Sequence, residues 1–349
     1  MRIAATATAY PPHYFTQQEV VNGLLTYWDK GMENSAVIER LHSRTGVDGR
    51  YFCRPLVEYY GLDTWGKTND VWIEVAMDLG EEAIDSVLKQ AGVDRSQVGA
   101  LFFVSVTGVS SPSVDARLVN RMGLNPQIKR NPIFGLGCVA GAAGLVRAAD
   151  YVRAYPDQVA ILLSVELCSL TWQRDDVSVA NLIGSGLFGD GAAAVLVAGA
   201  ETKLQGPKVA GNHAVFYPDT ERVMGWDISE RGFSLVLSPD VPKVVSENLG
   251  KNVDCFLAKN GLKRSDVGTW IMHTGGPKVL EATEAALDLR DGELSGSWEA
   301  LRRVGNLSSA SVLVVLDEVM KNNRPAPGTR SILAAMGPGF CSEMLLLEW

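Results

Sequence analysis

The sequence predicts an α/β protein of two similar halves, in which sheets and helices stack in layers. Three observations support this prediction. The chain has 349 residues, enough for one large two-part domain or two ordinary domains. Short apolar runs of strand length alternate with segments of helical periodicity. This order recurs after a change of composition at residues 199–211, so we divide the chain into residues 1–205 and 206–349.

The first half alternates strands and helices from its first residues. Buried strands are expected at Ile3–Ala9, Gly99–Val106, Asn131–Phe134, Gln158–Glu166 and Ala192–Val197. Helical periodicity predicts helices at Gln17–Trp28, Asn34–Leu41, Asp70–Ala91, Val114–Met122 and Leu145–Arg153. Pro11 and Pro12 end the first strand because proline has no N–H to donate to a sheet.

The second half repeats the pattern with fewer elements. Helices are expected at Val241–Asn260, Pro277–Leu287 and Ser308–Lys321, and strands at Gly268–Met272, Ser331–Met336 and Glu343–Trp349. Strands and helices in both halves must cover each other's apolar faces, which favours layered packing.

The composition excludes several classes of protein. Hydrophobic residues make up 46% and charged residues 21%, and the formal net charge of −8 argues against a non-specific nucleic-acid binder. No apolar run is long enough to span a membrane, and the N-terminal run is too short for a signal peptide. The five cysteines are scattered without C-x-x-C spacing, so we expect no disulfide framework, no metal site and a reducing cytoplasm.

One segment organises the chain, and its centre is Cys138. The run FGLGCVAGAAG follows an expected strand and precedes an expected helix, so Cys138 lies at a helix N-terminus. Unpaired N–H groups and the helix dipole favour a thiolate there. The alternative is a buried cysteine on a Gly- and Ala-rich packing helix, since free cysteine is commonly buried.

Two further polar residues follow apolar segments. His273 stands where an expected strand opens into a Gly-Gly-Pro turn, and Asn306 precedes an expected helix that is rich in small residues. Each alone is ordinary, as a structural histidine or a turn and cap. Together with Cys138 they supply a nucleophile, an imidazole and a neutral amide donor.

These motifs identify the chain as similar to the type III polyketide synthases, the chalcone synthase superfamily of the thiolase fold. GLGCVAGAAG, LFGDGAAAVL, HTGGPK, GNLSSASVL and GPGF occur in the expected order along nearly the whole chain. The resemblance implies stacked αβαβα layers and a homodimer. It also implies that Cys138 is the nucleophile and that His273 and Asn306 complete the site.

The resemblance implies acyl-CoA and malonyl-CoA as substrates, with no metal or redox cofactor. An acyl group would load onto Cys138, malonyl-CoA would lose CO₂, and the enolate would attack the bound acyl group. An imidazolium form of His273 could lower the Cys138 thiol pKa from about 8.5 by several units. His273 and Asn306 would donate to the enolate oxygen, and Arg40 and Arg44, in a basic turn-rich loop, would bind coenzyme A phosphates. The alternative for that loop is a solvated surface.

Further residues match positions that shape the substrate cavity in the family. They are Phe188, Val106, Cys168, Thr171, Trp226, Ser308 and Pro338. Phe188 corresponds to the gate between tunnel and cavity. Val106 replaces a threonine of the plant pattern, which argues against chalcone-type cyclisation. Trp226 replaces a small residue and would narrow one lobe of the cavity and redirect a long acyl tail. Ser111 lies where relatives extend a side chain into the partner's cavity.

The resemblance is closest to bacterial alkylresorcinol and alkylpyrone synthases. We therefore expect a fatty acyl-CoA starter and a cyclised alkylpyrone- or alkylresorcinol-like product. One alternative is a ketoacyl synthase III-like enzyme that uses acyl-carrier-protein substrates. Others are a Cys-His-Asn thioester hydrolase and a non-catalytic protein of the same fold.

Overall fold

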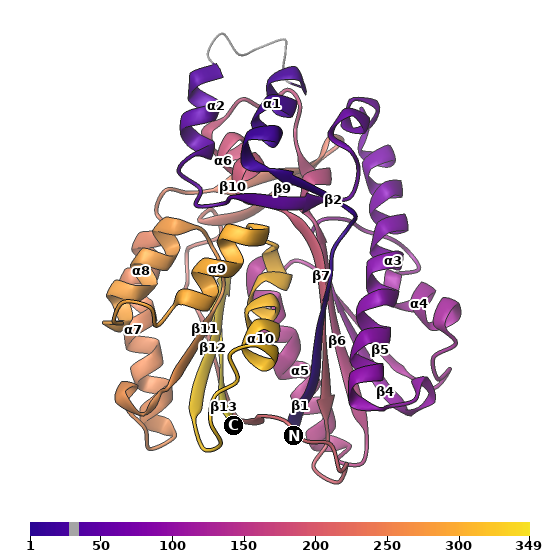
Figure 1. Ribbon diagram of the computed structural model, residues 1–349, viewed down its shortest axis with the longest axis vertical. Helices are drawn as coiled ribbons and strands as arrows, with labels where there is room; N and C mark the ends of the chain where they lie inside the picture. The colour runs from indigo at the N-terminus through magenta and orange to yellow at the C-terminus, as the bar shows by residue number, and fades with distance from the viewer. Residues whose placement is uncertain (28–34) are drawn as a thin grey trace.

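The computed structural model describes residues 1–27 and 35–349, and within these ranges nine strands form one sheet (Figure 1). One group of strands comes from the first half: β1 (Arg2–Ala9), β4 (Val98–Val104), β5 (Lys129–Ile133), β6 (Val159–Leu167) and β7 (Asp190–Ala198). The other group comes from the second half: β8 (Lys208–Phe216), β11 (Thr269–Met272), β12 (Arg330–Gly337) and β13 (Cys341–Glu348). Their order is β11-β12-β13-β8-β1-β7-β6-β4-β5.

The two groups of strands meet at β1 and β8. Arg2 pairs with Lys208 there, and the Ile3 N–H donates to the Pro207 carbonyl at 2.9 Å. Each group combines parallel and antiparallel pairs: β4 is parallel to β5 and β6, and β11 is parallel to β12, whereas β7 and β13 run antiparallel to their neighbours. The sheet is continuous across residue 205, so the division into domains stays a prediction.

The helices form three layers around the two groups of strands (Figure 1). α3 (Trp65–Ala91) and α4 (Val114–Met122) cover the outer face of the first group. α5 (Ala140–Ala154) and α10 (Ser311–Lys321) pack between the groups. α7 (Val241–Lys259), α8 (Pro277–Leu287) and α9 (Ser295–Val304) lie on the far side of the second group. This is the expected αβαβα stacking.

The central layer is almost fully apolar, which explains why α5 and α10 are rich in small and branched residues. Its core includes Ala142, Ala148, Val312 and Leu316, each with no exposed surface. Small side chains on α5 allow close approach: an added Cβ at Gly141 would lie 2.2 Å from the Ser309 carbonyl oxygen. The first turns of the two helices therefore meet inside the molecule.

The remaining elements lie above the layers in Figure 1. They are α1 (Gln17–Tyr27), α2 (Ser35–His42), α6 (Val179–Leu187), the pair β2 (His13–Thr16) and β3 (Gly49–Phe52), and the pair β9 (Met224–Ser229) and β10 (Gly232–Leu237). Short 3₁₀ turns complete the structure: η1 (Leu56–Gly61), η2 (Arg95–Gln97), η3 (Gly137–Val139), η4 (Cys168–Thr171), η5 (Arg264–Asp266) and η6 (Ser308–Ala310).

Most expected elements are confirmed, with shifts at their ends. α3 begins at Trp65 rather than Asp70 because Thr64 caps it through the Lys67 N–H. The expected helix ends at Trp28 and Asn34 lie outside the described residues. The prediction missed β8, α6, α9 and both two-stranded sheets. β8 begins inside the supposed boundary segment. After the buried Val209 it contains only partly exposed and exposed residues, so it lacks the apolar run of a buried strand. In the part of the chain that the structure describes, no helix combines the length and apolarity needed to cross a bilayer.

Candidate active site

Cys138 lies in η3, immediately before α5, and is 4% exposed. Gly137 makes this turn possible, since it has φ of +53°, and a Cβ there would lie 2.7 Å from the ring of Pro338. Pro338 therefore packs against the turn that carries Cys138. The expected strand, turn and helix around this cysteine are confirmed.

The Cys138 thiol is nearly surrounded by apolar groups. Its Sγ lies 3.7 Å from the Ser308 hydroxyl oxygen. Burial, with a smaller contribution from the Glu166 carboxylate, raises the pKa of Cys138 to about 12. The expectation of a lowered thiol pKa is therefore wrong for this state of the site, because desolvation outweighs the helix N-terminus.

His273 follows β11 and is held by its own backbone, whose N–H donates to the Ala334 carbonyl at 3.0 Å. Both ring nitrogens are buried without a hydrogen-bond partner among the described residues. Burial lowers the pKa of His273 to about 4, so the imidazole is neutral at neutral pH. The expected imidazolium–thiolate pair is thus replaced by a neutral imidazole and a thiol.

Asn306 is fully buried just before η6. Its backbone N–H donates to the Leu187 carbonyl at 2.9 Å, and its carbonyl accepts from the Gly189 N–H at 3.0 Å. The side-chain Oδ1 accepts from the Ser308 N–H at 2.8 Å. The Nδ2 group has no partner in the described ranges. An amide held by its oxygen leaves two N–H donors for a substrate oxygen.

The three residues converge on one region of the molecule. Cys138 belongs to an apolar cluster with Met224, Val241 and Phe340, and the same three residues line a cavity with His273. Ser308 connects the thiol to the Asn306 side, since its hydroxyl approaches Sγ and its N–H holds the amide. The thiol, the imidazole and the amide come from distant segments and are linked by these shared neighbours.

A second pocket gathers most of the expected cavity residues. Its lining consists of Cys168, Thr171, Trp172, Asn181, Gly184, Ser185, Phe188, Trp226 and Leu235. Its non-atom space is about 250 Å³, including solvent at its mouth. Phe188 forms a β-bridge with Asn306, so the backbone links this pocket to the amide.

The other expected cavity residues lie elsewhere. Ser308 contacts the thiol, and Pro338 supports the cysteine turn. Val106 is buried, and its N–H donates to Glu166 at 3.1 Å. Ser308, Pro338 and Val106 are therefore not among the residues that line the second pocket.

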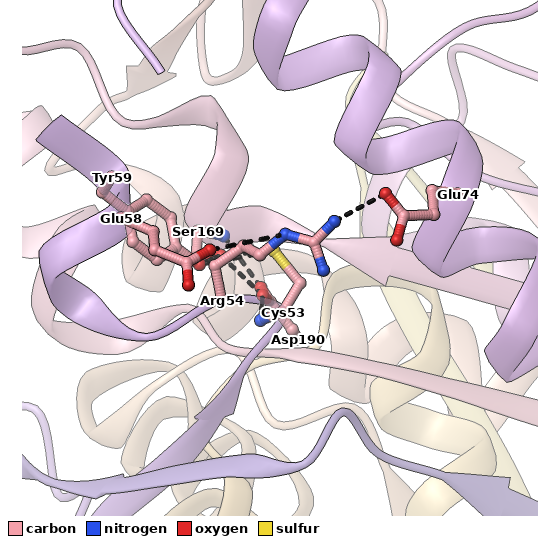
Figure 2. A network of polar contacts seen from close by, with 7 residues as sticks. All are labelled: Cys53, Arg54, Glu58, Tyr59, Glu74, Ser169 and Asp190. Atoms are coloured by element: carbon pink, nitrogen blue, oxygen red, sulfur yellow. Dashed lines mark hydrogen bonds and ion pairs between the residues drawn. The ribbon is translucent and has the colours of Figure 1, made fainter. Parts of the chain in front are cut away.

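The buried carboxylate of Asp190 holds Ser169, which is adjacent in sequence to Cys168 of this pocket (Figure 2). Asp190 accepts from the Ser169 N–H at 2.8 Å, the Ser169 hydroxyl at 2.5 Å and the Cys53 N–H at 2.8 Å. Tyr59 joins the network through Ser169 and Cys53. Burial raises the pKa of Asp190 to about 6. Since Ser169 lies in η4, Asp190 holds the turn that carries Cys168 and Thr171.

Arg40 lies in the last turn of α2 and Arg44 in the turn after it, and both are exposed. Arg40 lines an open pocket together with Glu39 and Asp48. These acidic neighbours oppose an anionic ligand there, so the pocket is electrostatically mixed.

The sequence reasoning missed the polar groups that support the site. Glu166 is fully buried and accepts from the Ser309 hydroxyl, from the Val106 N–H and from Thr107 Oγ1 at 2.9 Å. Ser311 was assigned only to a helix, yet it contacts Asn306. Two features of the sequence could have indicated them. Glu166 ends an apolar strand, and three serines follow Asn306 within five residues.

The chain resembles known proteins over nearly its full length. Family models for chalcone and stilbene synthases match residues 1–201, the N-terminal domain, and 209–348, the C-terminal domain. A 1,3,6,8-tetrahydroxynaphthalene synthase of Streptomyces peucetius subsp. caesius is 48% identical over 99% of this chain and 93% of its own. A putative chalcone synthase of Bacillus subtilis is 39% identical over 87% of this chain and 86% of its own.

A solved structure has the same fold. The 1,3,6,8-tetrahydroxynaphthalene synthase of Streptomyces coelicolor A3(2), a bacterial type III polyketide synthase, matches with a TM-score of 0.94 and 30% identity, covering 100% of this chain and 99% of its own. The comparisons lend no support to the carrier-protein-dependent or hydrolase alternatives.

Proposed function

Because the chain belongs to the chalcone and stilbene synthase family and is a type III polyketide synthase, we propose that Cys138, His273 and Asn306 carry out its acyl transfer and condensation. The observation that carries this proposal is a set of buried side-chain nitrogens at the site that have no hydrogen-bond partner among the described residues. The Asn306 Nδ2 and both His273 ring nitrogens lack partners among the described residues, while the Cys138 thiol borders the same apolar wall.

The first step loads the starter. With a pKa of about 12 the thiol needs a base, and the neutral His273 imidazole takes its proton. The thiolate attacks the acyl-CoA carbonyl, and the C–S bond to coenzyme A breaks. The proton on His273 then neutralises the departing coenzyme A thiolate, and an acyl thioester on Cys138 remains.

The second step generates the carbon nucleophile. The bond between the malonyl carboxylate and its methylene carbon breaks, CO₂ leaves, and the electron pair becomes the thioester enolate. Asn306 Nδ2 and an N–H of His273 donate to the enolate oxygen, where negative charge develops. The enolate carbon attacks the acyl group on Cys138, a C–C bond forms, and the Cys138 thiolate leaves.

The names of the relatives and the lining of the second pocket support a proposal for the starter and product. The similar synthases are named for a naphthalene with hydroxyl groups at alternate carbons, a skeleton that two-carbon units alone can supply. In this chain Trp172, Phe188 and Trp226 wall a compact pocket, and flat walls suit an aromatic product. The favoured reaction is therefore condensation of malonyl-CoA units into a polyhydroxylated aromatic.

A fatty acyl-CoA starter is the second candidate, with an alkylpyrone- or alkylresorcinol-like product. The cavity beside His273 favours it, since Val245, Leu249, Met272 and Val279 give that cavity an apolar lining. Apolar walls suit an alkyl chain and provide little for a phenol.

Product analysis separates the two candidates. Purified enzyme is incubated with labelled malonyl-CoA, alone and with acyl-CoAs of graded length, and products are identified by mass. Aromatic product from malonyl-CoA alone supports the first candidate, and products that retain the acyl chain support the second. Cys138→Ala is the control, and condensation by that variant at the normal rate would contradict the proposed mechanism.

Three further proposals concern the whole enzyme. Arg40 and Arg44 bind coenzyme A phosphates, the enzyme is a homodimer in the cytoplasm, and no cofactor takes part beyond its thioester substrates. Light scattering tests the dimer, and the KM for malonyl-CoA in Arg40→Ala and Arg44→Ala tests the phosphate contact.

A further inference from the structure

We infer that Ser311 is a positioning residue that, together with the Ser308 N–H, holds the Asn306 amide with its N–H₂ end toward the substrate. This inference rests on the proposed role of Asn306 as donor to the enolate. An amide presents either an acceptor oxygen or an N–H₂ donor, and only the donor end stabilises developing negative charge.

Ser311 is the first residue of α10 and is 2% exposed. Its Oγ accepts a hydrogen bond from the Leu307 N–H at 2.7 Å. The same hydroxyl donates to Asn306 Oδ1 at 3.2 Å. Because the Leu307 N–H occupies an Oγ lone pair, the serine proton remains for the amide oxygen.

Two donors therefore meet the Asn306 oxygen from the protein side. The second is the Ser308 N–H at 2.8 Å, which can only donate. A flipped amide would set its N–H₂ group against this backbone N–H and lose that bond, and the Ser311 hydroxyl would have to turn its proton away to accept. The observed orientation leaves Nδ2 buried without a partner in the described ranges. Ser311 thus holds the donor end toward the reaction.

A merely structural role is the competing explanation. Ser311 also satisfies the Leu307 N–H, and serine is common at helix starts. That role predicts a lower melting temperature after substitution, with all steps of the reaction affected equally. The positioning role predicts that only steps using the Asn306 amide are slowed, so the two explanations differ in which step changes.

The experiment compares Ser311→Ala and Ser311→Thr in the full-length enzyme. CO₂ release from carboxyl-labelled malonyl-CoA measures decarboxylation, and mass spectrometry of the acylated protein after quenching measures loading of Cys138. Ser331→Ala is the matched control, since Ser331 is also fully buried and accepts one side-chain bond, from Trp349 Nε1 at 2.7 Å.

Ser311→Ala should lower kcat for CO₂ release by roughly threefold to tenfold, the effect of one lost hydrogen bond, without changing KM or the loading rate. Ser311→Thr keeps a hydroxyl and should recover most of the rate. In an Asn306→Ala background, Ser311→Ala should cause no further loss, because Ser311 acts through Asn306.

Three results would overturn the inference. Ser311→Ala could release CO₂ at the normal rate, it could slow loading as much as decarboxylation, or its loss could persist in the Asn306→Ala background. In each case, a strong effect of Asn306→Ala alone would leave the proposed function intact. An inert Asn306→Ala would instead contradict the role of Asn306, and Ser311 positioning with it.

Discussion

α5 and α10 begin in the same way, after a short 3₁₀ turn, but the residues around the start of α5 are apolar and those around the start of α10 are polar. Each helix lies in the central layer and follows a 3₁₀ turn. The proposed nucleophile Cys138 lies in η3, and the proposed donor Asn306 lies just before η6. At α5 the Cys138 thiol belongs to an apolar cluster, and its Sγ contacts the Ser308 hydroxyl. At α10 the Ser308 N–H and the Ser311 hydroxyl donate to Asn306 Oδ1. The Ser309 hydroxyl donates to Glu166.

The contrast separates reacting atoms from supporting atoms. In the described part of the chain, both His273 ring nitrogens and Asn306 Nδ2 are buried without a hydrogen-bond partner, and Cys138 Sγ contacts the Ser308 hydroxyl. Asn306 Oδ1 has two donors, which hold the amide rigidly. A rigid donor with a free N–H₂ group needs little reorganisation when charge develops. Substitutions at the two helix starts should therefore slow different steps of the reaction.

The largest effect should come from the start of α5. Cys138→Ala removes the nucleophile, so condensation should fall by at least about 10³-fold. Malonyl-CoA decarboxylation should decline much less, because its proposed donors, His273 and Asn306, follow β11 and precede η6. Product formation and labelled CO₂ release, measured on the same preparation, check this. Equal loss of both would show that the two helix starts do not act on separate steps.

The next largest effect should come from the start of α10. Asn306→Asp places a carboxylate beside the developing enolate and should lower decarboxylation by about 10²- to 10³-fold. Loading of Cys138 should be nearly unchanged, since it does not use the amide. The rate of acyl-enzyme formation by mass spectrometry is the control measurement. A loading defect as large as the decarboxylation defect would contradict this division.

The difference between the helix starts also marks what the sequence could reveal. Cys138, His273 and Asn306 were predicted because each breaks an apolar or glycine-rich run, and their motifs are similar to those of a known family. Phe188, Thr171, Cys168 and Trp226 were expected near one cavity and line one pocket. Strand and helix types were mostly predicted because buried runs show clear periodicity.

Other features depend on three-dimensional environment. The raised pKa of Cys138 reflects burial among residues such as Met224 and Phe340, which lie far away in sequence. The bond from Ser311 to Asn306 needs the angle of the 3₁₀ turn between them. The network of Asp190 links Cys53 with Ser169, more than a hundred positions apart. No spacing rule connects such residues.

The pH dependence of Cys138 reactivity should give a moderate effect. With a thiol pKa of about 12 and a His273 pKa of about 4, both groups are neutral between these values. Alkylation by iodoacetamide should therefore rise about tenfold per pH unit from about pH 7 to about pH 9.5, as the thiolate fraction grows. A rate that is flat in this range would indicate an ion pair. Cys138→Ala corrects for the other cysteines.

The smallest effect concerns stability at the start of α10. Ser309→Ala removes a donor to Glu166, whose pKa burial raises, and should lower the free energy of unfolding by about 1–3 kcal/mol at neutral pH. Ser309 favours the carboxylate, so its loss costs most where Glu166 is ionised. The cost should shrink as pH falls through the folded-state pKa of Glu166, because a protonated carboxyl depends less on this donor. Urea unfolding at neutral and mildly acidic pH, with Ser331→Ala as control, measures this; a cost independent of pH would mean that Ser309 supports packing rather than the buried charge.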